Sequence, residues 1–231
     1  MKRNLFYCCL FVVLLSLQYS CNDDNAQEDL MGFWEPHPEI ATDMTWESSA
    51  PVVVNDLSMS TPEIAGMSTQ FANTLLPAKV RAISFRKDNK LEVTYINDET
   101  GYLTTEVFGT YRMINRSKFT FSPDISKFAG VLDGMSATMR EGIKLYATAG
   151  ISVQYYYIGN NTEEIRFYLT MSTLKESRYL FPFLAAAILG KEADNTTIQS
   201  MLESVPAHLE KTSKIELGFN FYKLKYFNYS I

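Results

Sequence analysis

The alternation of apolar and polar residues predicts eight short strands in this chain. It is clearest between residues 151 and 171, where two segments carry apolar or aromatic residues at their odd-numbered positions and Gly159 lies between them. A period of two sends alternate side chains to opposite faces, so one face of each strand is expected to be buried. Such half-buried strands are typical of antiparallel sheets. The predicted strands are residues 31–35, 80–86, 90–97, 103–114, 117–122, 150–158, 164–171 and 213–226.

Two longer strands continue the same pattern. Each has an apolar residue at nearly every second position and polar turn residues at its ends. Their expected inward faces are Val107, Gly109, Tyr111 and Met113 in the first strand, and Ile215, Leu217, Phe219 and Phe221 in the last.

A helical period predicts four helices between these strands, over residues 61–76, 124–147, 174–190 and 196–205. The first is expected to begin with Thr61 as its N-cap and to stop at Pro77, and the fourth to stop at Pro206. Three of these helices are followed directly by a strand. The expected buried stripes are Ile64, Met67, Phe71 and Leu75 in the first helix, and Ile125, Phe128, Leu132, Met135, Met139, Ile143 and Tyr146 in the second.

The third helical segment is apolar on every side from Tyr179 to Leu189. Eleven residues interrupted by Pro182 are too few to span a bilayer, so a buried helix is expected there. A segment that dips into a membrane is the alternative.

The first twenty residues have the form of a secretion signal. A positive start, Lys2-Arg3, precedes an apolar run from Leu5 to Leu17, and Cys21 follows a small residue. This ending resembles the lipobox of bacterial lipoproteins, although Gln18 takes the place usually held by leucine. The resemblance implies cleavage before Cys21 and acylation of that cysteine, which anchors the protein in a lipid bilayer. An incidental free thiol is the alternative.

Residues 21–29 are then expected to form a polar, lipidated tether. Asn22-Asp23-Asp24-Asn25 resembles the acidic stretch that directs Bacteroidota lipoproteins to the outer face of the outer membrane. The implied location is the outer membrane, exposed at the cell surface or otherwise facing the periplasm. The alternative is that these residues form only a solvated linker and carry no export signal.

Charge and cysteine content narrow the possible functions. Of 231 residues, 46% are hydrophobic, as in ordinary globular proteins. Without residues 1–20 the chain keeps 19 basic and 26 acidic residues, a net charge of −7, which disfavours nucleic acid as a partner. Cys8 and Cys9 leave with the signal, so Cys21 remains alone and no disulfide can form.

Catalytic and metal-binding patterns are scarce. The two histidines, His37 and His208, lie far apart in sequence, no Gly-x-Ser-x-Gly or phosphate-loop motif occurs, and no cofactor is expected. Two acid pairs, Glu163-Glu164 and Asp98-Glu99, adjoin predicted turns and leave a carboxylate-based hydrolase as a minor hypothesis.

Eight antiparallel strands with short connections suit an up-and-down barrel, because closure removes the sheet edges. Gly32-Phe33-Trp34 on the first strand resembles the Gly-x-Trp signature of lipocalins. The chain is thus similar to the lipocalin-like, or calycin-like, domains of Bacteroidota lipoproteins. The resemblance implies one mainly β domain over residues 30–231, an eight-stranded barrel with inserted α-helices. Lipocalins usually place an arginine over this tryptophan, whereas the last strand here offers Lys214, Lys223 and Lys225.

Aromatic residues on the inward faces could line a ligand cavity, since a tyrosine offers a flat apolar ring and an orienting hydroxyl. The main hypothesis is a non-enzymatic surface lipoprotein that binds a small apolar or glycan-like ligand in its barrel. An accessory envelope protein that acts through protein contacts is the alternative, and in that case the same residues form only a core. The candidate ligand-binding residues are Trp34, Tyr95, Tyr111, Tyr155, Tyr157, Phe167 and Phe219.

Overall fold

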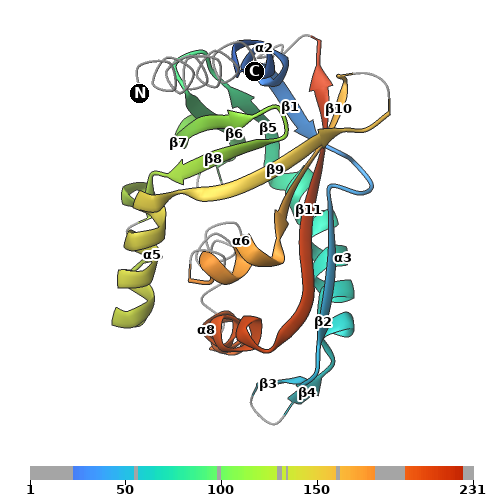
Figure 1. The fold of residues 1–231 in the computed structure, drawn as a ribbon, viewed down its shortest axis with the longest axis vertical. Helices are drawn as coiled ribbons and strands as arrows, with labels where there is room; N and C mark the ends of the chain where they lie inside the picture. Colours follow the sequence, from blue (N-terminus) through green and yellow to red (C-terminus); the bar gives the residue numbers. More distant parts are fainter. Residues whose placement is uncertain are drawn as a thin grey trace, which may run out of the picture.

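The computed structural model describes residues 23–54, 57–97, 100–128, 132–133, 135–159, 162–179 and 196–225. It confirms the predicted fold class, a mainly β protein with a closed, eight-stranded antiparallel barrel (Figure 1). Strands neighbour one another in the order β1-β5-β6-β7-β8-β9-β10-β11, and β11 pairs with β1 to close the barrel. These are the eight strands that alternation predicted. Their bounds are Gly32–Pro36 (β1), Val80–Phe85 (β5), Lys90–Ile96 (β6), Leu103–Asn115 (β7), Lys118–Pro123 (β8), Ile151–Tyr157 (β9), Glu164–Thr170 (β10) and Thr212–Leu224 (β11).

Strand β11 pairs with β10 along one edge and is long enough to pair with two further strands along the other. Its last residues pair with β1, whereas Thr212 to Phe219 pair with β2 (Thr42–Ser48). A separate hairpin joins β3 (Val52–Val54) to β4 (Leu57–Met59). The eight predicted strands did not include β2, β3 or β4. The apolar–polar alternation in β2 is short, because only Met44 and Trp46 alternate with polar residues. The strand is stabilised by its pairing with β11.

Residues Asp23–Leu30 form a helix, α2, and not the expected flexible tether. Ala26 and Leu30 lie one turn apart, and both are buried. The helix lies across one end of the barrel (Figure 1), where Gln27 Nε2 donates to Asn89 Oδ1 at 3.0 Å. The folded domain therefore begins before residue 30.

Helix α3 (Thr61–Lys79) is capped by Ser60, not by Thr61. The Ser60 hydroxyl accepts from the Glu63 amide, and the Glu63 carboxylate accepts from the Ser60 amide at 2.9 Å. Pro77 does not stop the helix but lies in its last turn. The buried face also differs from the predicted stripe, since it consists of Thr61, Ile64, Ala65 and Leu76.

The predicted helix over 124–147 is interrupted. Residues Ile125–Phe128 form a 3₁₀ turn, and α5 starts anew at Ala137 and runs to Ala149. Ser136 caps this new helix by accepting from the Met139 amide, which explains the restart. Of the predicted stripe, Leu132, Met139 and Ile143 are buried, and Ile125, Met135 and Tyr146 are partly buried against the same cluster. The side chain of Phe128 lies outside the described residues.

The remaining helices are α6 (Met171–Glu176) and α8 (Thr196–Glu210). Helix α8 continues through Pro206, contrary to the expected stop. Residues 180–190 of the predicted buried helix lie outside the described residues. The predicted order of helix followed by strand is confirmed for α3–β5, α5–β9 and α8–β11. No helix in the described ranges is long and apolar enough to cross a membrane.

One predicted inward residue changes face. The register of β6 and β7 shifts so that Leu91 pairs with Gly109 but Glu92 pairs with Val107. Val107 therefore leaves the face that carries Gly109 and Tyr111.

Two apolar clusters meet inside the molecule. One fills the barrel, and the other lies among α3, α5, α6 and α8 and the extended part of β11 and β2 (Figure 1). Phe121 and Val153 pack against both clusters, so the core is continuous.

Candidate functional site

Six of the seven predicted ligand-binding residues meet in the barrel. Trp34, Tyr111, Tyr155 and Phe167 are at most 5% exposed and belong to its core cluster. Tyr157 and Phe219 pack against that cluster. Tyr95 is the exception, since it lies outside the cluster with its ring centre 5.9 Å from that of Phe108.

Phe85 lies at the centre of this interior and was absent from the predicted set. Its ring centre is 5.0 Å from that of Tyr111, 5.4 Å from Phe119 and 5.6 Å from Phe167. Rings at these separations are in direct contact. Phe85 lies on the apolar face of a correctly predicted strand, so alternation could have identified it. These side chains form a packed aromatic core.

The end of the barrel near α2 is closed around Trp34. The Trp34 indole donates to the Leu30 carbonyl at 2.8 Å, which joins β1 to α2. Lys223 is its direct neighbour on β11 and places Nζ 5.1 Å from the centre of the Trp34 ring. Burial lowers the pKa of the Lys223 ammonium. A lysine thus covers the tryptophan where lipocalins usually have an arginine.

The tyrosine hydroxyls of the interior differ in their partners. Tyr111 donates to the Arg86 carbonyl at 2.9 Å and accepts from Gln27 at 3.3 Å. The Tyr157 hydroxyl is buried and has no hydrogen-bond partner in the described part of the chain. Burial raises the pKa of Tyr155 and Tyr157 well above the usual range of tyrosine, so both remain neutral phenols at physiological pH.

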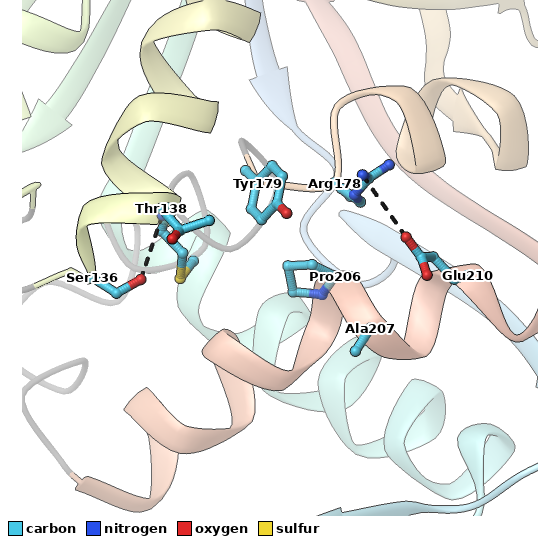
Figure 2. A pocket seen from close by; sticks show the side chains of 8 residues that line it. Ser136, Thr138, Arg178, Tyr179, Pro206, Ala207 and Glu210 are labelled. Carbon is cyan, nitrogen blue, oxygen red and sulfur yellow. Dashed lines mark hydrogen bonds and ion pairs between the residues drawn. The ribbon is translucent and has the colours of Figure 1, made fainter.

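A pocket of about 370 Å³ lies outside the barrel, where α5, α6 and α8 approach one another (Figure 2). The start of α5 forms one wall, α8 forms another, and the residues that follow α6 lie between them. It is lined by Ser136, Thr138, Met139, Arg178, Tyr179, Pro206, Ala207 and Glu210.

Charge in the pocket is concentrated on one side. Arg178 Nη2 lies 3.8 Å from Glu210 Oε1, and the guanidinium carbon is 5.3 Å from the centre of the Tyr179 ring. Hydrogen bonding with Tyr179 raises the pKa of Arg178 further, so it stays cationic. The hydroxyls of Ser136 and Thr138 lie on the opposite side (Figure 2), and Met139 also lines the pocket.

Gly142 makes room for the aromatic wall of this pocket. A Cβ at this position would lie 2.5 Å from Cδ2 of Tyr179. A glycine inside α5 lowers helix propensity, and here it permits the close approach of the ring.

The structure also shows the contacts of the two histidines and of part of the two acid pairs. His37 Nδ1 accepts from the amides of Glu39 and Ile40, both at 3.2 Å, and its Nε2 lies 2.7 Å from the Tyr222 hydroxyl. Burial lowers the pKa of His208. The described residues contain no group of histidine, cysteine or acidic side chains that could hold a metal ion. Glu163 pairs with Lys225 at 2.9 Å, and Asp98, Glu99 and Cys21 lie outside the described residues.

We compared the chain with models of protein families, with curated proteins and with solved structures, and found no significant match in any of the three.

Proposed function

We propose that this protein is a non-enzymatic outer-membrane lipoprotein, anchored by an acylated Cys21, that binds a small ligand in the pocket between α5, α6 and α8. In this proposal the barrel is a rigid frame. The observation that supports it is the contrast between the two sites. Aromatic rings are in mutual contact inside the barrel, whereas the helical pocket places a cation and an aromatic ring beside open space.

The lining suggests the class of ligand. A volume of about 370 Å³ is within the usual size of small-molecule sites. Met139, Tyr179 and Pro206 offer apolar contact, and Arg178 can bind a carboxylate or sulfonate through two N–H groups. Glu210 is 66% exposed, so it can turn toward solvent when an anion replaces it at Arg178. We therefore propose a small aromatic or aliphatic organic anion.

The experiment uses 8-anilinonaphthalene-1-sulfonate as a fluorescent probe of this class, with 3-phenylpropionate as a competitor. Arg178→Gln is expected to weaken probe binding about tenfold or more, since a charged hydrogen bond contributes about 1.5–3 kcal/mol. Lys87→Gln removes an exposed cation from the turn between β5 and β6, outside the pocket lining, and is expected to leave binding unchanged. The neutral alcohol 3-phenylpropanol should compete poorly. Equal binding by Arg178→Gln and the unaltered protein would exclude this site.

A second candidate function is that of an accessory envelope protein that acts through protein contacts. Met67 and Phe71 lie one turn apart on α3 and are 60% and 49% exposed. Adjacent exposed apolar side chains offer a small apolar surface that a protein partner can cover. Cross-linking from this face in whole cells, with and without Met67→Ser and Phe71→Ser, would test it.

The anchor and its location need separate measurements. Intact-mass analysis of protein purified from membranes should show a chain that begins at Cys21 and carries acyl groups. Digestion by protease added to whole cells is expected if the protein faces outward. Protection on whole cells with digestion after lysis would place it on the periplasmic side.

A further inference from the structure

The strand directions decide which turns lie at the end of the barrel covered by α2. Gly32 at the start of β1 pairs with Phe85 at the end of β5, and Phe33 pairs with Leu224 near the end of β11. The β5–β6 turn and the β7–β8 turn therefore lie at the same end as α2. The contact between Gln27 and Asn89 agrees with this placement. Helix α8 and the β3–β4 hairpin lie toward the other end of the long axis (Figure 1).

The proposed anchor, Cys21, lies close to α2 along the chain. Only Asn22 separates Cys21 from Asp23, where α2 begins. Two residue steps span at most roughly 7 Å of fully extended chain. Because residues 23–30 are folded, little free tether is left.

We infer that the barrel stands on the bilayer by its α2 end, and that the β7–β8 hairpin contacts anionic lipid headgroups there. This inference rests on the proposed acylation of Cys21. It places the pocket between α5, α6 and α8 on the side away from the membrane, where a ligand from the surroundings can reach it.

The charges of this end favour contact by one hairpin in particular. Several basic residues there already have acidic partners, since Lys90 lies 2.6 Å from Asp88 and Lys225 lies 2.9 Å from Glu163. In the described residues at and beside the β5–β6 and β7–β8 turns, four others have no ion-pair partner. These are Lys87, Arg112, Arg116 and Lys118, from two neighbouring turns and the strand ends beside them.

The same hairpin also exposes an apolar side chain. Ile114 is 42% exposed between Arg112 and Arg116. Basic residues beside an exposed apolar side chain suit the interface of an anionic bilayer, where phosphates attract the cations. Glu28 and Asp29 of α2 lie at this end too, and anionic headgroups repel their carboxylates. The attraction to anionic lipid is therefore confined to the hairpin.

The test measures orientation with single labels. The mature chain has no other cysteine once Cys21 is acylated, so Ser117→Cys and Tyr102→Cys can each carry one fluorophore. Tyr102 precedes the opposite end of β7, up to about 40 Å away along the strand. The purified lipoprotein is inserted in phosphatidylcholine vesicles with or without phosphatidylglycerol, and quenching by a nitroxide on the headgroups is recorded.

We expect several-fold stronger quenching at position 117 than at 102, and a further increase with phosphatidylglycerol. Lys87→Glu combined with Arg116→Glu and Lys118→Glu should abolish that increase. The matched control is Arg140→Glu with Lys144→Glu and Lys211→Glu, which has the same net charge and should retain it. Equal quenching at the two positions in acylated protein would overturn the orientation alone. A mature chain without acyl groups would overturn the anchor and the orientation together.

Discussion

Lys223 holds its ammonium group 5.1 Å from the centre of the Trp34 ring and donates to the Asp29 carbonyl at 2.8 Å. The two side chains are direct neighbours on β11 and β1, the strands that close the barrel. This pair therefore joins the last strand, the first strand and α2 at one point.

Replacing Lys223 by methionine keeps an apolar stem but removes the cation. We expect the free energy of unfolding in urea to fall by about 1–2 kcal/mol, because a partly desolvated cation–π contact and a hydrogen bond are lost. Lys223→Arg should retain most of the stability. Lys214→Met, at a 63% exposed ion pair, should change it little. Equal stability of Lys223→Met and the unaltered protein would show that the contact is incidental.

Phe85→Ala is expected to destabilise the barrel by about 3–5 kcal/mol, since it opens a cavity among rings that now touch. Phe71→Ala provides the matched control, because that side chain is 49% exposed on α3 and should cost less than about 1 kcal/mol. Urea titration measures both. A small loss at Phe85 would instead indicate a loosely filled interior with room for a ligand.

Stability should decrease in alkali because of the buried tyrosines. Burial raises the pKa of Tyr155 and Tyr157 above the ordinary value of 10.0. Above pH 10 the folded chain therefore holds protons that the unfolded chain has released, and the free energy of unfolding falls as pH rises. Tyr155→Phe with Tyr157→Phe should flatten this decline in urea titrations between about pH 9 and pH 11. An unchanged slope in the double variant would assign the decline to other groups.

Gly218 permits an ion-pair network on the outer face of the sheet. The Arg166 guanidinium lies over this glycine, with Nη2 at 2.7 Å from Asp43 Oδ1 and 2.9 Å from Glu216 Oε1. A Cβ at position 218 would overlap the guanidinium.

We therefore expect Gly218→Ala to cost about 1–3 kcal/mol, because it displaces Arg166 from both carboxylates. In an Arg166→Ala background the same change should cost little, and a double-mutant cycle measures the difference. Gly66→Ala is the control, since nothing lies within 4 Å of its Cβ position in α3, and it should be neutral or stabilising. Additive effects in the cycle would contradict the proposed overlap.

The sequence by itself determined the strands and their buried faces. Residues such as Ile165, Phe167 and Leu169 alternate with polar neighbours, and this local pattern requires no knowledge of distant residues. It therefore predicted all eight barrel strands and the class of fold. It also brought six of the seven candidate residues into one interior, because the inward faces of neighbouring strands must meet when a sheet closes.

Only the tertiary structure decided how the interior is filled and which segments join the fold. Whether a barrel is packed depends on the combined volume of rings from several strands, such as Phe85 from β5 and Phe167 from β10, and no local pattern records that sum. Helix α2 and strand β2 have few apolar residues, and they are stabilised by partners far along the chain, the barrel end and β11. The pocket has the same origin, since Met139 of α5, Arg178 after α6 and Glu210 of α8 come together only when these separate segments pack.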